Sequence, residues 1–141
     1  MTEKTVNPTR EALTLLRELP PDQPVVMLNL LRYREQAAYP ADAEATPCSG
    51  REAYKRYSRI AQKHVAAIGG ELAWLGSVQA HLIAPAQERW DDVMLVRYPS
   101  VAAFLQMLAD PEYQAATVHR TAALEDSRLI ATSQLIPAAD G

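Results

Sequence analysis

Three titratable side chains recur along one predicted helix at spacings that bring them toward a single side. Tyr57 follows Tyr54 by three residues, and His64 follows Tyr57 by seven. A period of 3.6 residues places both tyrosines on the inward face of this helix, with His64 at its border. Together they would supply hydroxyl donors and a base to a pocket between helix and sheet. Tyrosines at this spacing are also typical of a core in which only the hydroxyl tips are polar.

An amide and an arginine stand out within two apolar runs of the sequence. Asn29 is the one amide inside the run 25–31, where a buried amide without partners costs about 1–3 kcal/mol. It therefore either orients a ligand in a pocket or ties down a neighbouring loop. Arg97 ends a second run on the same side as Val93 and Leu95, where it would bind an anion or simply reach water.

A further arginine lies on a helix face that is expected to point toward the sheet. Arg120 shares this face with Tyr113 and Thr117. An inward arginine needs a carboxylate, which Asp126 or Glu112 could supply within the chain, and otherwise it would bind a ligand. The candidate ligand-binding residues are therefore Asn29, Tyr54, Tyr57, His64, Arg97 and Arg120.

The sequence lacks the spacings of the common cofactor and nucleophile motifs. His64, His81 and His119 lie on three different predicted elements, with no HxxxH or CxxC pattern, so we predict no bound metal. No GxGxxG, GxxxxGK[ST] or GxSxG pattern occurs, and Cys48 lies in a predicted loop without a motif-placed histidine. We therefore predict no cofactor and no cysteine or serine nucleophile.

The elements that must position these residues follow from apolar periodicity, caps and helix breakers. Predicted helices span 9–19, 50–69, 100–109 and 110–125, and predicted strands span 25–33, 71–84, 92–98 and 129–136. Ser49 and Glu52 form a capping box at the start of the second helix, and Gly69-Gly70 ends it. The second predicted strand, 71–84, is long for one domain, and Gly76 is the expected place for a bulge or bend.

This order of elements predicts an α+β fold with an antiparallel sheet. Without the first helix it reads βαββαβ, the split unit of ferredoxin-like folds, with the first and third strands in the middle and both main helices on one face. We predict a single domain over 1–141, consisting of an N-terminal helical extension (1–23) and a core (24–137).

Both predicted central strands are apolar on both faces, so the sheet needs cover on both sides. Two helices cover one face, and the simplest cover for the other is a second copy around a two-fold axis. We therefore predict a homodimer that buries the face carrying Val26, Leu28, Met94 and Val96, or its opposite. The alternative is that the loop 34–49 or the first helix folds over that face.

Composition limits the possible partners and location. The 141 residues carry a net charge of −3, so the chain has no excess of positive charge that would attract nucleic acid or an anionic membrane. The N-terminus lacks the pattern of a signal peptide, and no apolar run is long enough to span a membrane. A single cysteine forms no internal disulfide. We predict a cytoplasmic protein that binds neither nucleic acid nor membrane.

Several segments in order resemble the family known as domain of unknown function 1330. They are VVMLNLLRYRE, EAYKRYS, IGGE, ERWDDVMLVRYPS, DPEY and ALEDSRLI, and they span residues 25–130. The resemblance implies membership of the dimeric α/β barrel superfamily, whose members are ferredoxin-like units joined sheet to sheet. It implies the fold and the dimer but no activity.

Three functions fit these expectations. The first is a cofactor-independent enzyme that acts on a small acidic or phenolic organic molecule. The alternative is a protein that binds or senses such a molecule without turnover, and the third is a dimer that acts only as an interaction partner. Titratable pocket groups with shifted pKa values would favour catalysis, whereas an apolar pocket would favour binding.

Overall fold

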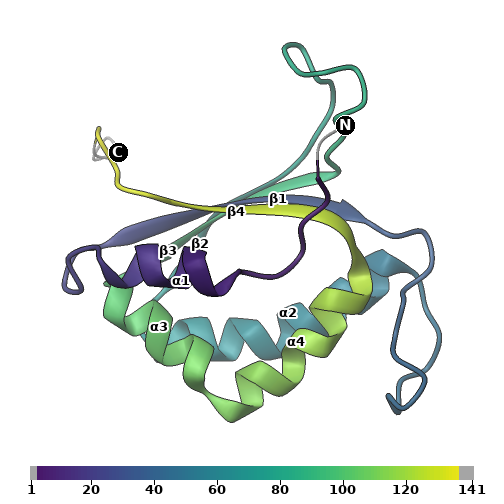
Figure 1. Ribbon diagram of the computed structural model, residues 1–141, viewed down its shortest axis with the longest axis horizontal. Helices are drawn as coiled ribbons and strands as arrows, with labels where there is room; N and C mark the ends of the chain where they lie inside the picture. The colour runs from purple at the N-terminus through teal and green to yellow at the C-terminus, as the bar shows by residue number, and fades with distance from the viewer. Residues whose placement is uncertain (1–2, 137–141) are drawn as a thin grey trace.

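Helices and strands alternate along the computed structural model, which describes residues 3–136 of the chain (Figure 1). The helices are α1 (Arg10–Arg17), α2 (Gly50–Ala67), α3 (Val101–Ala109) and α4 (Pro111–Ala123). The strands are β1 (Val25–Tyr33), β2 (Glu71–Ser77), β3 (Asp92–Tyr98) and β4 (Leu124–Thr132). The division into an extension (1–23) and a core (24–137) stays a prediction, and residues 1, 2 and 137 lie outside the described part.

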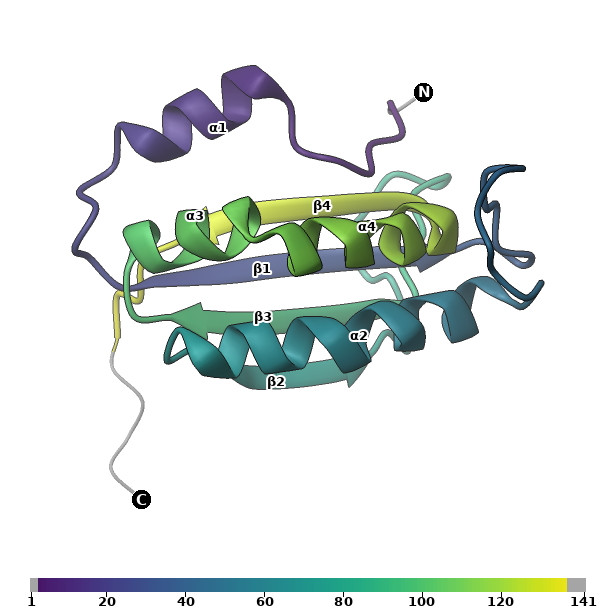
Figure 2. The ribbon, with the colours of Figure 1, turned by 90° about the horizontal axis from the view of Figure 1, so that it is seen from below.

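The four strands form one antiparallel sheet in the order β2-β3-β1-β4. Helices α2, α3 and α4 lie together on one face of this sheet (Figures 1 and 2). The additional helix α1 lies beside the β4 edge, on the same side as the other helices. This arrangement confirms the predicted ferredoxin-like βαββαβ fold with β1 and β3 in the centre.

The predicted helix signals operate as expected. The Ser49 hydroxyl accepts a hydrogen bond from the Glu52 backbone N–H at 3.1 Å, which caps α2. Gly69 ends the same helix with a φ of +82°, a left-handed conformation that glycine adopts without steric cost. Asp110 caps α4 by accepting from the backbone N–H groups of Glu112 and Tyr113. These contacts fix the direction in which α2 and α4 cross the sheet.

Strand β2 is shorter than predicted, and its irregularity lies elsewhere. It ends at Ser77 rather than at residue 84, and the register shifts between Leu72 and Trp74 rather than at Gly76. The Trp74 ring lies across Gly76, where an added Cβ would come within 2.1 Å of it. Gly76 is therefore needed for close packing of this ring. The following residues, 78–91, form a loop that rises from the sheet on the side away from the helices (Figure 1).

Strand β4 begins earlier than predicted, at Leu124, directly after α4. This start could not be recognised in the sequence, because the first half of β4 consists mainly of polar residues. Asp126 and Ser127 are nevertheless buried, at 8% and 3% exposure, because the N-terminal residues bond to them. A buried polar strand with long-range partners has no periodic apolar signal.

The register between the strands shows which residues share each of the two faces of the sheet. On the face covered by helices, Met27 lies opposite Val96 and Asn29 lies opposite Met94. On the other face, Leu28 lies opposite Leu95 and Leu30 lies opposite Val93. The predicted grouping of Val26 and Leu28 with Met94 and Val96 is therefore wrong. Each strand alternated as expected, but the pairing between strands could not be derived from either strand alone.

We call the side of the sheet away from the helices the free face. Its apolar side chains are Val26, Leu28, Leu30, Trp74, Val93, Leu95 and Ile130. Neither segment considered as a cover lies over it. The loop 34–49 bonds instead to the end of α4, through Arg34 to Ala123 and Ala38 to Ala122. Helix α1 lies on the helix side of the β4 edge (Figure 2).

Within residues 3–136, no helix is both long enough and apolar enough to cross a membrane. The longest helix, α2, has 18 residues and carries charged side chains along its outer surface.

Candidate functional site

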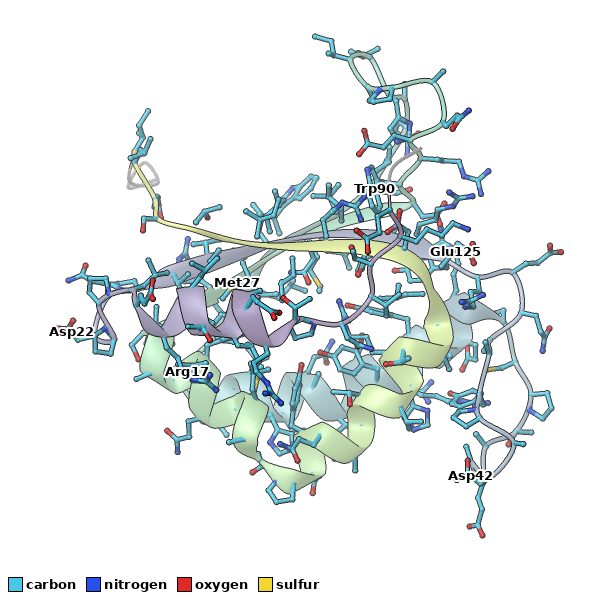
Figure 3. The ribbon with its side chains drawn as sticks, in the orientation of Figure 1. Arg17, Asp22, Met27, Asp42, Trp90 and Glu125 are labelled. Carbon is cyan, nitrogen blue, oxygen red and sulfur yellow. The ribbon has the colours of Figure 1, made fainter. Side chains whose placement is uncertain are left out.

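A cavity of about 920 Å³ lies between the sheet and the helix layer. Met27 and Asn29 of β1 form part of one wall, and α2 and α4 form the opposite wall. Residues 5–9 and α1 close the side next to β4. Side chains from both layers point into this space (Figure 3). The lining is mainly apolar with a few polar groups, as is typical of sites for small organic ligands.

Arg120, in the last turn of α4, is a buried cation that lines this cavity, which Arg128 of β4 also lines. It is 9% exposed, and its Nη1 donates to the Val6 carbonyl at 2.5 Å. Among the described residues, no carboxylate oxygen lies within 4.0 Å of its guanidinium. Its guanidinium also lies beside the Tyr54 hydroxyl, where burial raises the pKa and the charge of Arg120, with a hydrogen bond, partly offsets that rise.

The expected carboxylate partners of Arg120 are bound elsewhere. Asp126 accepts from the Thr5 backbone N–H at 2.9 Å and from Arg128 at 2.7 Å. Glu112 Oε1 accepts a hydrogen bond from His64 Nε2 at 3.0 Å, on the outside of the helix layer. The predicted internal ion pair of Arg120 is therefore wrong. A buried guanidinium whose charge the protein does not neutralise is suited to an anionic ligand.

An N-terminal strap, residues 3–7, holds the Val6 carbonyl against Arg120. The strap runs beside the start of β4, where the Ser127 N–H donates to the Thr5 carbonyl at 2.7 Å. Thr5 Oγ1 also donates to the Ser127 carbonyl, and Lys4 pairs with Glu125. The strap is thus fixed along its length and forms a defined wall of the cavity.

Four tyrosine side chains line the same cavity, those of Tyr54, Tyr57, Tyr98 and Tyr113. The Tyr57 and Tyr113 hydroxyls share a hydrogen bond of 2.7 Å, and the Tyr54 ring lies 5.3 Å from that of Tyr57. Burial raises the pKa of Tyr54 to about 12, although the positive charge of Arg120 acts in the opposite direction. Burial, with the neighbouring tyrosines, raises the pKa of Tyr57 well above its ordinary value. At neutral pH the Tyr54 and Tyr57 hydroxyls are therefore protonated donors rather than bases.

Asn29 is bonded to the backbone of the sheet rather than to a loop, and its side chain also lines the cavity. Its Nδ2 donates to the backbone carbonyls of Met27 and Met94, at 3.3 and 3.4 Å, so the amide is partly tied to the sheet. The side chain also lines the cavity, and among the described residues its Oδ1 has no hydrogen-bond partner. This oxygen is available to accept a hydrogen bond from a ligand hydroxyl.

Two predicted residues lie outside the cavity. Arg97 lies on the free face and pairs with Glu71, because its partner across the sheet is Val26 rather than a residue of the helix side. Arg97 therefore lies on the side of Val93 and Leu95, as predicted, and does not contribute to the cavity that contains Asn29 and Arg120. His64 lies at the border of the inward face, as expected, but it contacts Glu112 and Asp110 rather than the cavity. The structure thus brings together Asn29, Tyr54, Tyr57 and Arg120.

The candidate set omitted several groups that the fold brings to the cavity. Tyr113 lies two helical turns before Arg120, and this spacing could have added it to the set. The Val6 carbonyl and the leucines of α1 carried no such signal, because they reach the site through contacts far apart in sequence. Within residues 3–136, no group of three His, Cys, Asp or Glu side chains is arranged to hold a metal ion.

Comparison with known proteins identifies relatives without assigning an activity. The model of the family described as domain of unknown function (DUF1330) matches residues 45–133. A crystal structure of a protein of unknown function from Rhodopseudomonas palustris is 41% identical, with a TM-score of 0.88, and the match covers 96% of this chain and 100% of that one. The methylated form of that protein gives the same identity and TM-score, with 96% and 98% covered.

More distant structures share only the fold. A hydroxynitrile lyase from Passiflora edulis is 12% identical, with a TM-score of 0.52, over 83% of this chain and 100% of that one. No curated protein matches the chain. The family match covers more than half of the sequence, and the Rhodopseudomonas protein is similar over nearly its whole length. The chain therefore belongs to the DUF1330 family of proteins of unknown function.

Proposed function

We propose that the protein binds a small organic acid in this cavity, with the ligand carboxylate paired to Arg120. The observation that carries the proposal is a buried guanidinium that has no carboxylate partner among the described residues. Leaving a charge buried without a counter-charge costs several kcal/mol, and a ligand carboxylate would remove that cost. Arginine also binds a carboxylate through two parallel hydrogen bonds, which fixes the orientation of the ligand.

The other polar groups of the cavity support an acid that also carries an oxygen substituent. Tyr54 and the Tyr57–Tyr113 pair offer hydroxyl groups, and those of Tyr54 and Tyr57 stay protonated because burial raises their pKa. The Asn29 Oδ1 offers an acceptor on the opposite wall. A hydroxy acid or a phenolic acid would use both kinds of group. The apolar remainder of the lining would cover its carbon skeleton.

We expect small monocarboxylates to stabilise the protein, whereas their neutral amides do not. The test is a thermal-shift screen of benzoate, 4-hydroxybenzoate and short aliphatic acids, each beside its amide. At a concentration about 100 times Kd, binding stabilises by about 2.7 kcal/mol, which raises Tm by several degrees. Equal shifts for acids and amides, or no shift with any acid, would contradict the proposal.

The affinity of such an acid should stay constant between about pH 6 and pH 9. A simple carboxylic acid is ionised above about pH 5, and an arginine side chain stays positively charged throughout. The raised pKa of Tyr54, about 12, keeps its hydroxyl protonated over this range. Calorimetric titrations at several pH values check this. A loss of affinity above about pH 8 would indicate that a group of the cavity titrates there.

Turnover of the bound acid is the second candidate function. The observation that favours it is the pair of linked hydroxyls of Tyr57 and Tyr113, 2.7 Å apart, beside the positive charge of Arg120. Protonated tyrosines can donate to a carbonyl oxygen on which negative charge develops. Incubation of each binding acid with the protein, followed by NMR of the acid, separates the two functions. A changed spectrum indicates an enzyme, and an unchanged one indicates a binding protein.

We further propose that the protein is a homodimer that buries the free face. Val26, Leu28, Leu30, Val93 and Leu95 form an apolar surface across β1 and β3. Trp74 and Ile130 extend it on the neighbouring strands, and they are 54% and 47% exposed in the single chain. An apolar surface of this kind on a central sheet is typical of an interface between identical copies.

We also propose a cytoplasmic location, because Cys48 is the sole cysteine and a reducing compartment suits a chain without an internal disulfide.

Light scattering coupled to size-exclusion chromatography should therefore give twice the chain mass of 15.6 kDa. The dimer is expected to persist at micromolar concentration, because an interface across a whole sheet face belongs to the standard size class or above. A single peak at the mass of one chain at this concentration would contradict the dimer.

A further inference from the structure

We infer that the ligand is an amphipathic monocarboxylic acid whose apolar tail lies beneath α1. This inference rests on the proposed function, which supplies the carboxylate contact at Arg120. It adds the shape of the rest of the ligand. It follows from the apolar face of α1, the separation of Arg120 from the apolar side chains of α3, and the connection between α1 and Arg120.

Helix α1 turns its apolar side chains toward the cavity without burying them in a core. Leu13, Leu15 and Leu16 all line the cavity, as does Leu19 just beyond the helix. Of these only Leu16 is buried, whereas Leu15 is 65% and Leu19 is 42% exposed. Apolar surface that borders an open cavity gains free energy when an apolar ligand covers it. The inner face of α1 is therefore an unfilled wall of the site.

The buried cation Arg120 and the apolar side chains of α3 lie toward different ends of the cavity. Arg120 is in the last turn of α4 and Tyr54 is near the start of α2, and these two helix ends lie side by side (Figure 2). Phe104 and Leu108, which also line the cavity, lie on α3 at the other end of the helix layer. Helix α1 runs toward that same apolar end. A ligand with a carboxylate at one end and a hydrocarbon tail matches this division.

The N-terminal strap and α1 form one short, continuous segment, which would contact both ends of such a ligand. The Val6 carbonyl is bonded to Arg120, and α1 begins only four residues later, at Arg10. Thr9 caps the helix by accepting from the Ala12 N–H at 3.0 Å. The position of α1 is therefore set relative to the guanidinium that receives the carboxylate. The segment 5–19 would contact the ligand along its length.

The test is a calorimetric series with butanoate, hexanoate, octanoate and decanoate, each compared with the alcohol of the same length. A fully buried methylene contributes about 0.8 kcal/mol, which corresponds to about fourfold in affinity. We expect the affinity of the acids to rise with length by up to this factor per methylene. The alcohols should bind much more weakly at every length, because they lack the contact with Arg120.

Two variants of α1 locate the tail. Leu13→Gln and Leu15→Gln should each weaken octanoate binding several-fold and leave butanoate binding unchanged, because the shorter acid does not reach α1. Both side chains lie outside the buried core, so the variants should fold, and circular dichroism checks this. Leu82→Gln is the matched control, since Leu82 is 91% exposed on the loop 78–91, away from the cavity.

The outcomes separate this inference from the proposed function. Equal affinity for all four acids, with weak alcohols, overturns the amphipathic ligand and leaves the carboxylate site standing. A rise with length that the α1 variants do not change overturns the placement of the tail. Equal binding of acids and alcohols, or no binding of any acid, overturns both proposals. A rise with length that the α1 variants reduce supports the inference.

Discussion

Replacement of Arg120 by methionine is expected to weaken carboxylate binding by at least about 30-fold. Truncating one partner of a buried, hydrogen-bonded charge pair costs about 2–5 kcal/mol, and 2 kcal/mol corresponds to about 30-fold. Arg120 is a buried cation that lines the cavity, and no carboxylate among the described residues pairs with it. Calorimetry with the tightest-binding acid of the thermal-shift screen measures the change.

The same substitution should leave the unliganded protein as stable as the wild type, or more so. Loss of the hydrogen bond to the Val6 carbonyl costs about 1–3 kcal/mol. Removal of a buried cation without a carboxylate partner offsets this cost, because apolar replacements of buried charges are often neutral or stabilising. A residue whose role is binding therefore shows lost affinity with unchanged Tm. A residue whose role is structural shows the reverse.

Two further arginine variants make this comparison specific. Arg120→Lys keeps the charge but loses the planar fork, so we expect it to restore only a small part of the affinity. Arg59→Met is the matched control, because Arg59 pairs with Glu52 on the exposed side of α2, with 70% of its side chain accessible. A clear loss of stability in Arg120→Met, together with unchanged affinity, would show that Arg120 is structural and that the site is wrong.

The fold could be predicted from local signals because each of them acts over a few residues. The Ser49 cap, Gly69 and the Asp110 cap set the limits of α2 and α4. The order of elements, βαββαβ after the first helix, placed β1 and β3 at the centre of the sheet. The register between them depends on loops and on packing across the sheet. It therefore could not be derived, and the predicted composition of the free face was wrong for Met94 and Val96.

The candidate site was predictable where helical periodicity decided the direction of a side chain. Tyr54, Tyr57 and Arg120 follow from the period of α2 and α4, and the cavity includes all three. Arg97 was wrongly included among the candidate residues. Which face of β3 lies against the Asn29 face of β1 depends on the register between the two strands, and Arg97 lies opposite Val26 on the free face. The missing partner of Arg120 also depended on tertiary contacts, since Asp126 bonds to Thr5 from the far end of the chain.

Replacement of Leu28 by aspartate is expected to dissociate the proposed dimer. Leu28 lies on β1 in the middle of the free face, between Leu95 of β3 and Ile130 of β4. A two-fold axis would bring two copies of the new carboxylate into the same apolar interface. Burial of an unpaired charge costs several kcal/mol, so Kd for dimerisation should rise by about 1000-fold or more. The single chain should still fold, because this face is not part of its core.

Light scattering and circular dichroism of the Leu28→Asp variant measure assembly and fold separately. Leu82→Asp is the matched control, because it places the same charge on an apolar residue that is 91% exposed outside the sheet. We expect this control to remain a dimer. A Leu28→Asp protein that is still dimeric at micromolar concentration would mean that the copies meet through another surface. The apolar free face, with Trp74 54% exposed, would then require a different partner to cover it.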